Sequence, residues 1–193
     1  MGRGPLVNPV GLAVEADGHL LIAQAIGVFP GVVRVDPASG DRTIVSGPTT
    51  GRGLLFSAPL SLAIESTGQL VVVDSALAAV VRVDPVSGDR TIVSDAGTGQ
   101  GLPLVAPTRI AIEADGHLLV VGQGLAAVVR VDPVSGNRDT ISGGPIARGS
   151  GPPLSVPVGI AVVPDGSLLV VDAFFRWVLR VDPATGNRTL LSQ

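Results

Sequence analysis

The tetrapeptide Arg34-Val35-Asp36-Pro37 decides the fold, because the chain repeats it three more times. The further copies end at Pro85, Pro133 and Pro183, so successive copies lie 48, 48 and 50 residues apart. Self-similarity at a fixed period of about 20–50 residues is typical of solenoids, propellers and arrays. The 193 residues therefore divide into four units, at about 1–46, 47–94, 95–142 and 143–193.

Each unit has the pattern of four short strands joined by turns. A Gly-x-Gly link and a proline precede a short apolar stretch, and an Asp-Gly or Thr-Gly pair then predicts a hairpin into a second apolar strand. Arg-Val-Asp-Pro ends the third strand, and a Pro-x-Ser/Thr-Gly turn leads into the fourth. Second strands are predicted at 20–23, 70–73, 118–121 and 168–171, third strands at 32–35, 80–83, 128–131 and 178–181, and fourth strands at 42–45, 90–93, 138–141 and 188–191.

Several strands are apolar on both faces, which indicates sheets that are covered on both sides. A propeller does this by packing each blade between two neighbours. We therefore predict an all-β propeller of four four-stranded antiparallel blades. Alanine at the centre of every first strand favours that strand as the innermost one, where little volume is available; the alanines are Ala13, Ala63, Ala111 and Ala161.

Four blades lie at the lower limit of known propellers. An open arc would expose the apolar faces of the first and last blades, which is unfavourable by about 25 cal/mol per Å². We therefore expect a homodimer that completes an eight-bladed ring. A closed four-bladed monomer and a fragment of a longer propeller are the alternatives.

Composition excludes several classes of function. All thirteen basic residues are arginine and there is no cysteine, which removes lysine Schiff bases, the P-loop lysine and thiol nucleophiles. A net charge of −3 gives no electrostatic footprint for nucleic acid. No apolar run reaches membrane-spanning length, and no signal-peptide pattern opens the chain, whose composition is of a bacterial type. We expect no cofactor, nucleic acid or membrane as a partner, and the compartment stays open.

The stretch from Pro157 to Pro183, with Gly-Ile-Ala-Val, Asp-Gly, Leu-Val-Val-Asp and Arg-Val-Asp-Pro in order, resembles the NHL repeat. It is also similar to the blades of gluconolactonase-like (SMP-30) and streptogramin lyase propellers. The resemblance covers nearly the whole chain and implies a β-propeller, commonly six-bladed, that serves mostly as a binding platform. No histidine or acidic set matches the metal or catalytic positions of those enzymes, so we assign no catalytic residue and no metal.

The repeat itself supplies candidate site residues. Glu15, Glu65 and Glu113 share one position at the end of the first strand, where carboxylates around a channel mouth would bind a cation, or would form a solvated rim. Arg109 replaces a small residue near the start of the innermost strand and would hold an anion there, or lie in solvent. The motif arginines are expected to form structural pairs, either with a neighbouring blade or with the motif aspartates: Arg34 with Asp36, Arg82 with Asp84, Arg130 with Asp132 and Arg180 with Asp182.

Two further features break the repeat. Phe174, Phe175 and Trp177 form an aromatic cluster in a loop that is alanine-rich in the second unit, and would anchor a partner, cover the end of a blade or form an intersubunit contact. His19 and His117 follow the Asp-Gly turns, where exposed histidines are more usual than a two-histidine metal site.

These observations favour a non-enzymatic repeat scaffold or binding module, recently amplified or engineered, with a protein or small-molecule ligand. A metal-dependent enzyme of the lactonase or lyase type and a fragment of a larger propeller interaction domain are the alternatives.

Overall fold

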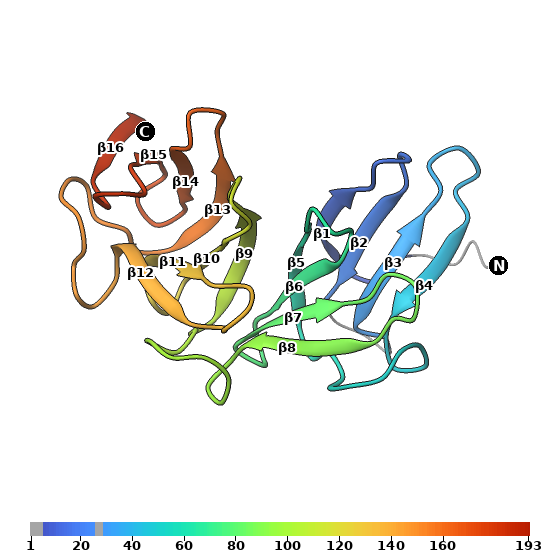
Figure 1. Ribbon diagram of the computed structural model, residues 1–193. Helices are drawn as coiled ribbons and strands as arrows, with labels where there is room; N and C mark the ends of the chain where they lie inside the picture. The colour runs from blue at the N-terminus through green and yellow to red at the C-terminus, as the bar shows by residue number, and fades with distance from the viewer. Residues whose placement is uncertain (1–5, 26–28) are drawn as a thin grey trace. The chain divides into compact units, whose positions relative to one another are not determined.

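The computed structural model describes residues 6–25 and 29–193, and this part of the chain contains sixteen β-strands in four antiparallel sheets (Figure 1). Each sheet is a meander of four consecutive strands, which is the predicted blade. Blade 1 contains β1 (Pro9–Val14), β2 (Leu20–Gln24), β3 (Gly31–Val35) and β4 (Arg42–Ser46). Blade 2 contains β5 (Pro59–Ile64), β6 (Leu70–Asp74), β7 (Ala79–Val83) and β8 (Arg90–Ser94). Blade 3 contains β9 (Pro107–Ile112), β10 (Leu118–Gly122), β11 (Ala127–Val131) and β12 (Arg138–Gly143). Blade 4 contains β13 (Pro157–Val162), β14 (Leu168–Asp172), β15 (Trp177–Val181) and β16 (Arg188–Ser192).

The turns form where the sequence places glycine. In the first hairpin of blade 2, Gly68 has a φ of 84° and donates its N–H to the carbonyl of Glu65. After β7, Gly88 has a φ of 77° and donates to the carbonyl of Asp84. These positive φ values suit glycine, and the same pattern recurs in the other blades. The four-bladed, all-β architecture predicted from the repeat is confirmed, whereas completion of an eight-bladed ring stays a prediction.

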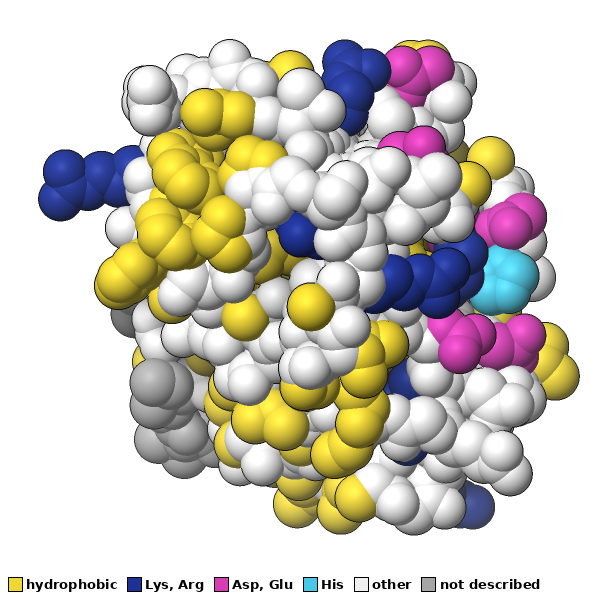
Figure 2. Space-filling view, turned by 90° about the vertical axis from the view of Figure 1, so that its left-hand side faces the viewer, with side chains coloured by type: hydrophobic (Ala, Val, Ile, Leu, Met, Phe, Trp, Pro, Cys, Tyr) yellow, Lys and Arg dark blue, Asp and Glu magenta, His cyan; other side chains and the backbone are white. Residues whose placement is uncertain are grey.

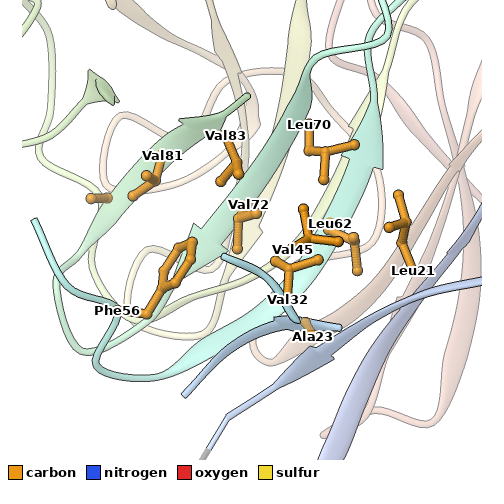
Figure 3. Close-up of a cluster of buried hydrophobic side chains, with 11 residues drawn as sticks. Leu21, Ala23, Val32, Val45, Phe56, Leu62, Leu70, Val72, Val81 and Val83 are labelled. Atoms are coloured by element: carbon orange, nitrogen blue, oxygen red, sulfur yellow. The ribbon is translucent and has the colours of Figure 1, made fainter. Parts of the chain in front are cut away.

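The chain divides into two compact units, Met1–Ile92 and Val93–Gln193. In the first unit, strand β1 packs against β5, and one hydrophobic cluster joins blades 1 and 2 (Figure 3). It includes Leu21 and Ala23 of blade 1, Leu62 and Val72 of blade 2, and Phe56 from the link between the blades. The first strands β1 and β5 therefore lie at the contact between these two blades, whereas their place as the innermost strands of a ring stays a prediction.

The second unit repeats this arrangement. Strand β9 packs against β13, and Leu119 and Val121 of blade 3 share a cluster with Leu168 and Val170 of blade 4. Trp177 packs against the edge of the same cluster. Among the described residues, no helix has the length and apolar character needed to cross a membrane.

Candidate functional site

The motif arginines of blades 1 to 3 form ion pairs with glutamates of their own blade. Arg82 donates from Nε and Nη2 to the two carboxylate oxygens of Glu65, both at 2.7 Å. In blade 3, Arg130 makes the same two-pronged contact with Glu113, at 2.5 and 2.6 Å. Strand register explains the pairing, because Arg82 lies opposite Val71, which lies opposite Ala63, and Glu65 follows two residues later on the same face. Arg34 and Glu15 form the equivalent pair in blade 1.

The predicted Arg–Asp pairs are therefore wrong in these blades. The motif aspartates instead accept backbone N–H groups of the following turn: Asp84 accepts from Val86 at 2.8 Å and Ser87 at 2.9 Å. These bonds hold the pKa of the Asp84 carboxyl below its usual value. The same turn bonds are made by Asp36, Asp132 and Asp182. An aspartate that ends a strand is closer to the turn amides than to the arginine, so the local bond forms.

Blade 4 departs from this arrangement. Val163 replaces the glutamate, and Arg180 donates to Asp165 at 2.9 Å and to the Ser167 hydroxyl at 3.2 Å. The predicted Arg180–Asp182 pair is not among these contacts. Arg180 and Asp165 are both largely exposed, unlike the half-buried pairs of the other blades. Blade 4 therefore has a weaker version of the internal ion pair.

The three glutamates predicted as a cation site are each bound to an arginine. The hydrogen bond to glutamate raises the pKa of Arg34 and of Arg130, so each carboxylate faces a permanent positive charge. Among residues 6–25 and 29–193, no group of three or more His, Asp or Glu side chains is arranged to hold a metal ion. The carboxylates thus serve blade structure, and cation binding at them would require breaking the ion pairs.

The remaining predicted polar residues have local partners. Arg109 lies in β9 and donates from Nη1 to the carbonyl of its neighbour Thr108 at 2.8 Å, so its anion-binding role stays a prediction. His19 and His117 each lie 3.0 Å from the aspartate of the preceding turn, Asp17 and Asp115. A polar hollow of about 190 Å³ in blade 3 is lined by His117, Arg130, Asp132, Ser135, Asn137 and Asp139. Arg130 and Asp132 in this hollow are already engaged by Glu113 and by the turn.

The aromatic side chains of blade 4 contact one another at the surface. Phe175 stacks on Trp177 with 4.5 Å between ring centroids, and Phe174 meets Phe175 edge-on at 4.9 Å. Phe174 is 67% exposed, whereas Trp177 is half-buried against the blade. Figure 2 shows hydrophobic side chains gathered in patches on the side where Figure 1 draws β16. The exposed large hydrophobic residues of blade 4 are Val171, Phe174, Leu190 and Leu191.

A fully buried carboxylate holds this loop in place. Asp172 accepts the N–H groups of Phe174 and Phe175 at 3.1 and 3.2 Å, and those of Ser155 and Val156 at 2.7 and 3.0 Å. Arg176, which lies between Phe175 and Trp177 in the sequence, adopts a φ of 61°, a conformation that only a few per cent of non-glycine residues adopt. The backbone that carries Phe174 and Phe175 is therefore held in place by hydrogen bonds to Asp172.

A second set of arginines was missed by the sequence analysis. Arg138, the first residue of β12, is 6% exposed and donates to the hydroxyl of Ser94 at 2.6 Å and to the carbonyl of Leu102 at 2.9 Å. It also donates to the carbonyls of Asp95 and Thr98, both at 2.8 Å. Arg90 and Arg188 make equivalent contacts with Ser46 and Ser142 and with the backbone of the preceding link. We call each arginine–serine contact of this kind an inter-blade node.

The signal for these nodes was present in the sequence, because every predicted fourth strand begins with arginine and has serine four residues later. The Gly-x-Gly link is part of the same structure. A Cβ on Gly99 would lie 2.0 Å from the carbonyl oxygen of Gly136, so the link approaches the next turn too closely for any side chain. The corresponding first link, Gly2-Arg3-Gly4, lies outside the described residues.

Comparison with known proteins supports the fold. No family model matches the chain, and no curated protein matches it. Among solved structures, virginiamycin B lyase from Staphylococcus aureus is similar with a TM-score of 0.70 and 16% identity, over 99% of this chain and 57% of that one. A chain of a nidogen/laminin complex is similar with a TM-score of 0.77 and 19% identity, over 98% of this chain and 66% of that one.

A third similar structure is the extracellular domain of BT4673, a one-component system protein of Bacteroides thetaiotaomicron, with a TM-score of 0.69 and 17% identity, over 99% of this chain and 26% of that one. The first two neighbours are β-propellers of the NHL type, as the sequence resemblance implies. The chain spans less than two thirds of either of them. At these identities the likeness shows the fold alone, and the neighbours include both an enzyme and a protein of a binding complex.

Proposed function

We propose that this protein is a non-enzymatic binding scaffold that contacts a protein partner through the aromatic loop of blade 4. The observation that carries the proposal is the stack of Phe174, Phe175 and Trp177 at the surface. Aromatic side chains dominate the energetic centres of protein interfaces, because they bury a large area at a small cost in conformational entropy. A partner segment with apolar side chains fits this surface best.

The difference between blades supports a specific role for this loop. Blade 2 has a buried aspartate at the same position, Asp74, which accepts the N–H groups of Ser57, Ala58 and Leu77 as Asp172 accepts those of Ser155, Val156 and Phe175. Blade 2 carries Ala76 and Leu77 where blade 4 has Phe174 and Phe175. The alanine-rich sequence of blade 2 therefore suffices to build the loop. Large aromatic residues at the exposed positions of blade 4 add apolar surface that the fold does not need.

The charged residues favour binding over catalysis. The glutamates at the ends of the first strands are engaged by arginines, and the inter-blade arginines are engaged by backbone carbonyls. A lactonase- or lyase-type reaction would need a set of polar groups directed at a substrate. The proposed role holds equally for four blades alone and for four blades of a longer propeller interaction domain.

The test uses a displayed random peptide library selected against the chain. Enriched peptides should bind the Phe174→Ala variant at least tenfold more weakly than wild type, and should change the fluorescence of Trp177, the single tryptophan. The matched control is Phe29→Ala, since Phe29 is an exposed phenylalanine of blade 1. No enrichment, or equal binding to the Phe174→Ala variant, would contradict the aromatic loop as the binding surface.

The enzymatic alternative is tested separately with the substrate that a structural neighbour's name gives. The chain is incubated with virginiamycin B and Mg²⁺, and the antibiotic is followed by chromatography. We expect no conversion above the rate without protein. Conversion that is proportional to protein concentration would overturn the non-enzymatic part of the proposal.

A further inference from the structure

The inter-blade nodes follow one rule along the chain. The serine that ends or nearly ends the fourth strand of one blade accepts a hydrogen bond from the arginine that begins the fourth strand of the next. The Nη1–Oγ distances are 2.6 Å for Arg90–Ser46, 2.6 Å for Arg138–Ser94 and 2.8 Å for Arg188–Ser142. Each serine hydroxyl in turn donates to a glycine carbonyl of the following blade, at 2.7 Å in all three nodes.

This pairing of each fourth-strand serine with the fourth-strand arginine of the next blade leaves the first of these arginines and the last of these serines unmatched. Arg42 begins β4 of blade 1, and its Nε and Nη1 atoms are buried without a hydrogen-bond partner in the described part of the chain. Ser192 ends β16 of blade 4 and is exposed, whereas Ser46, Ser94 and Ser142 have no exposed surface. In the complete nodes, Nε donates to a carbonyl of the blade's own preceding link, and for blade 1 most of that link lies outside the described residues. Nη1 instead donates to the serine of the neighbouring blade. The buried Nη1 of Arg42 is therefore half of an incomplete node, because buried guanidinium donors without acceptors are unfavourable.

The two sheets that carry these half-nodes also have exposed apolar faces. In blade 1, Leu12 is 61% exposed, while its equivalent in blade 2, Leu62, is 4% exposed. In blade 4, Val171 is 43% exposed, while its equivalent in blade 3, Val121, has no exposed surface. Each face therefore matches a surface that is buried between blades elsewhere in the chain.

We propose that blade 4 of one copy packs against blade 1 of a second copy, and that Ser192 completes the node of the partner copy's Arg42. Blade 4 of this chain has both the apolar face and the serine that the internal contacts use, and we choose a second copy as the occupant because four blades lie at the lower limit of known propellers. A two-fold axis generates the reciprocal contact, in which blade 1 of the first copy packs against blade 4 of the second copy. Each copy's Arg42 then has a serine acceptor, and each copy's Ser192 has an arginine donor. This inference is independent of the proposed binding function.

Mass measurement by light scattering after size exclusion tests the assembly. Wild type is expected at twice the chain mass of 19.4 kDa. Arg42→Met and Ser192→Ala should each raise the dissociation constant of the dimer about a hundredfold to ten-thousandfold, because each removes one hydrogen bond to a charged group at both contacts of the two-fold dimer. The matched control is Ser87→Ala, an exposed turn serine that should leave dissociation unchanged.

Thermal melting separates a failed interface from a failed fold. Arg42→Met removes a buried charge that has no hydrogen-bond partner for Nε and Nη1 among residues 6–25 and 29–193, so the dissociated variant should melt no lower than dissociated wild type. A large drop in its melting temperature would show that Arg42 has partners within the chain and would overturn the proposal.

Engineered cysteines identify the faces, since the chain has none of its own. Leu21 and Leu62 share one cluster between blades 1 and 2, and their counterparts at the open faces are Leu169 and Leu12. Oxidising a mixture of Leu12→Cys and Leu169→Cys copies should give a disulfide-linked dimer, while either variant alone should not. A wild-type mass of 19.4 kDa, together with an intrachain disulfide in the variant that carries both substitutions, would show a closed monomer. Species larger than a dimer would show open-ended polymerisation. Either result would overturn the proposal.

Discussion

The two repeated arginines of a blade lie eight residues apart and are neutralised in different ways. Arg130 in β11 faces the carboxylate of Glu113 within the same blade. Arg138 in β12 has no carboxylate among its described partners and is surrounded by carbonyl oxygens and one serine hydroxyl. The conspicuous Arg-Val-Asp-Pro motif therefore stabilises a single blade, while the less conspicuous arginine joins the blade to the preceding link.

Burial is the reason to expect a larger contribution to stability from the second arrangement. Burial lowers the pKa of the related arginines Arg90 and Arg188, yet arginine stays protonated in proteins, so these charges must be solvated by the chain itself. The link carbonyls do this because the Gly-x-Gly segment brings several of them to one point. Removing such an arginine leaves several buried acceptors without a donor.

The largest effect is therefore expected for the Arg138→Met variant. It should lower the free energy of unfolding by about 3–5 kcal/mol, the range seen when one member of a buried charged network is removed. Urea denaturation monitored by circular dichroism measures this change. Arg138→Lys is the control, because it keeps the charge but loses the planar fork of donors, and it should recover only part of the stability. A loss below about 1 kcal/mol for Arg138→Met would contradict the inter-blade role.

The same contrast shows what the sequence could and could not predict. The strands and turns were predictable because they depend on local patterns, such as the glycines at 68 and 88 that take positive φ. The Arg82–Glu65 pair was missed because the two residues meet across the intervening strand β6, and the nearer Asp84 competed as the expected partner. A contact across a strand depends on register, which the repeat alone does not display.

The inter-blade nodes and the aromatic stack were harder to predict from the sequence. Ser46 and Arg90 are 44 residues apart, and their contact exists only once blade 2 packs on blade 1. The exposed loop at 174–177 was recognised as an aromatic cluster, but the stacking of Phe175 on Trp177 exists only in the folded loop, where Asp172 binds the N–H of Phe175. Packing between elements decided both features.

A smaller effect is expected for the ion pair within a blade. Glu113→Gln should destabilise the protein by about 1 kcal/mol, since the Glu113–Arg130 pair is only partly shielded from solvent. A double-mutant cycle with Arg130→Gln isolates the pair, and a coupling energy near zero would show that the pair contributes nothing beyond packing. A loss equal to that of Arg138→Met would remove the contrast between the two arginines.

The turn aspartates add a pH-dependent contribution that should be smaller still. The N–H groups of Ser87 and Val86 hold the folded pKa of Asp84 below the unfolded value of about 3.9. Its stabilisation is therefore complete above the unfolded pKa and is lost as the pH falls through the folded pKa. The melting temperature of Asp84→Asn should lie below that of wild type at pH 7, and the gap should narrow between about pH 5 and pH 2. A gap that stays constant over this range would rule out titration of Asp84 as the cause.

The smallest effect is expected from restoring the missing ion pair of blade 4. Val163→Glu places a carboxylate at the position of Glu15, Glu65 and Glu113, within the register that pairs them with arginine. The gain in unfolding free energy should not exceed about 0.5 kcal/mol, because Arg180 is exposed and already bonded to Asp165. Val163→Gln is the matched control for the change in size and polarity, and chemical denaturation of both variants in the Arg180→Gln background measures the coupling. If Val163→Glu is equally stabilising without Arg180, the gain does not come from the ion pair. A glutamate and an arginine in the right register would then be insufficient, and the ion pairs of blades 1 to 3 would owe their stability to their partial burial as well.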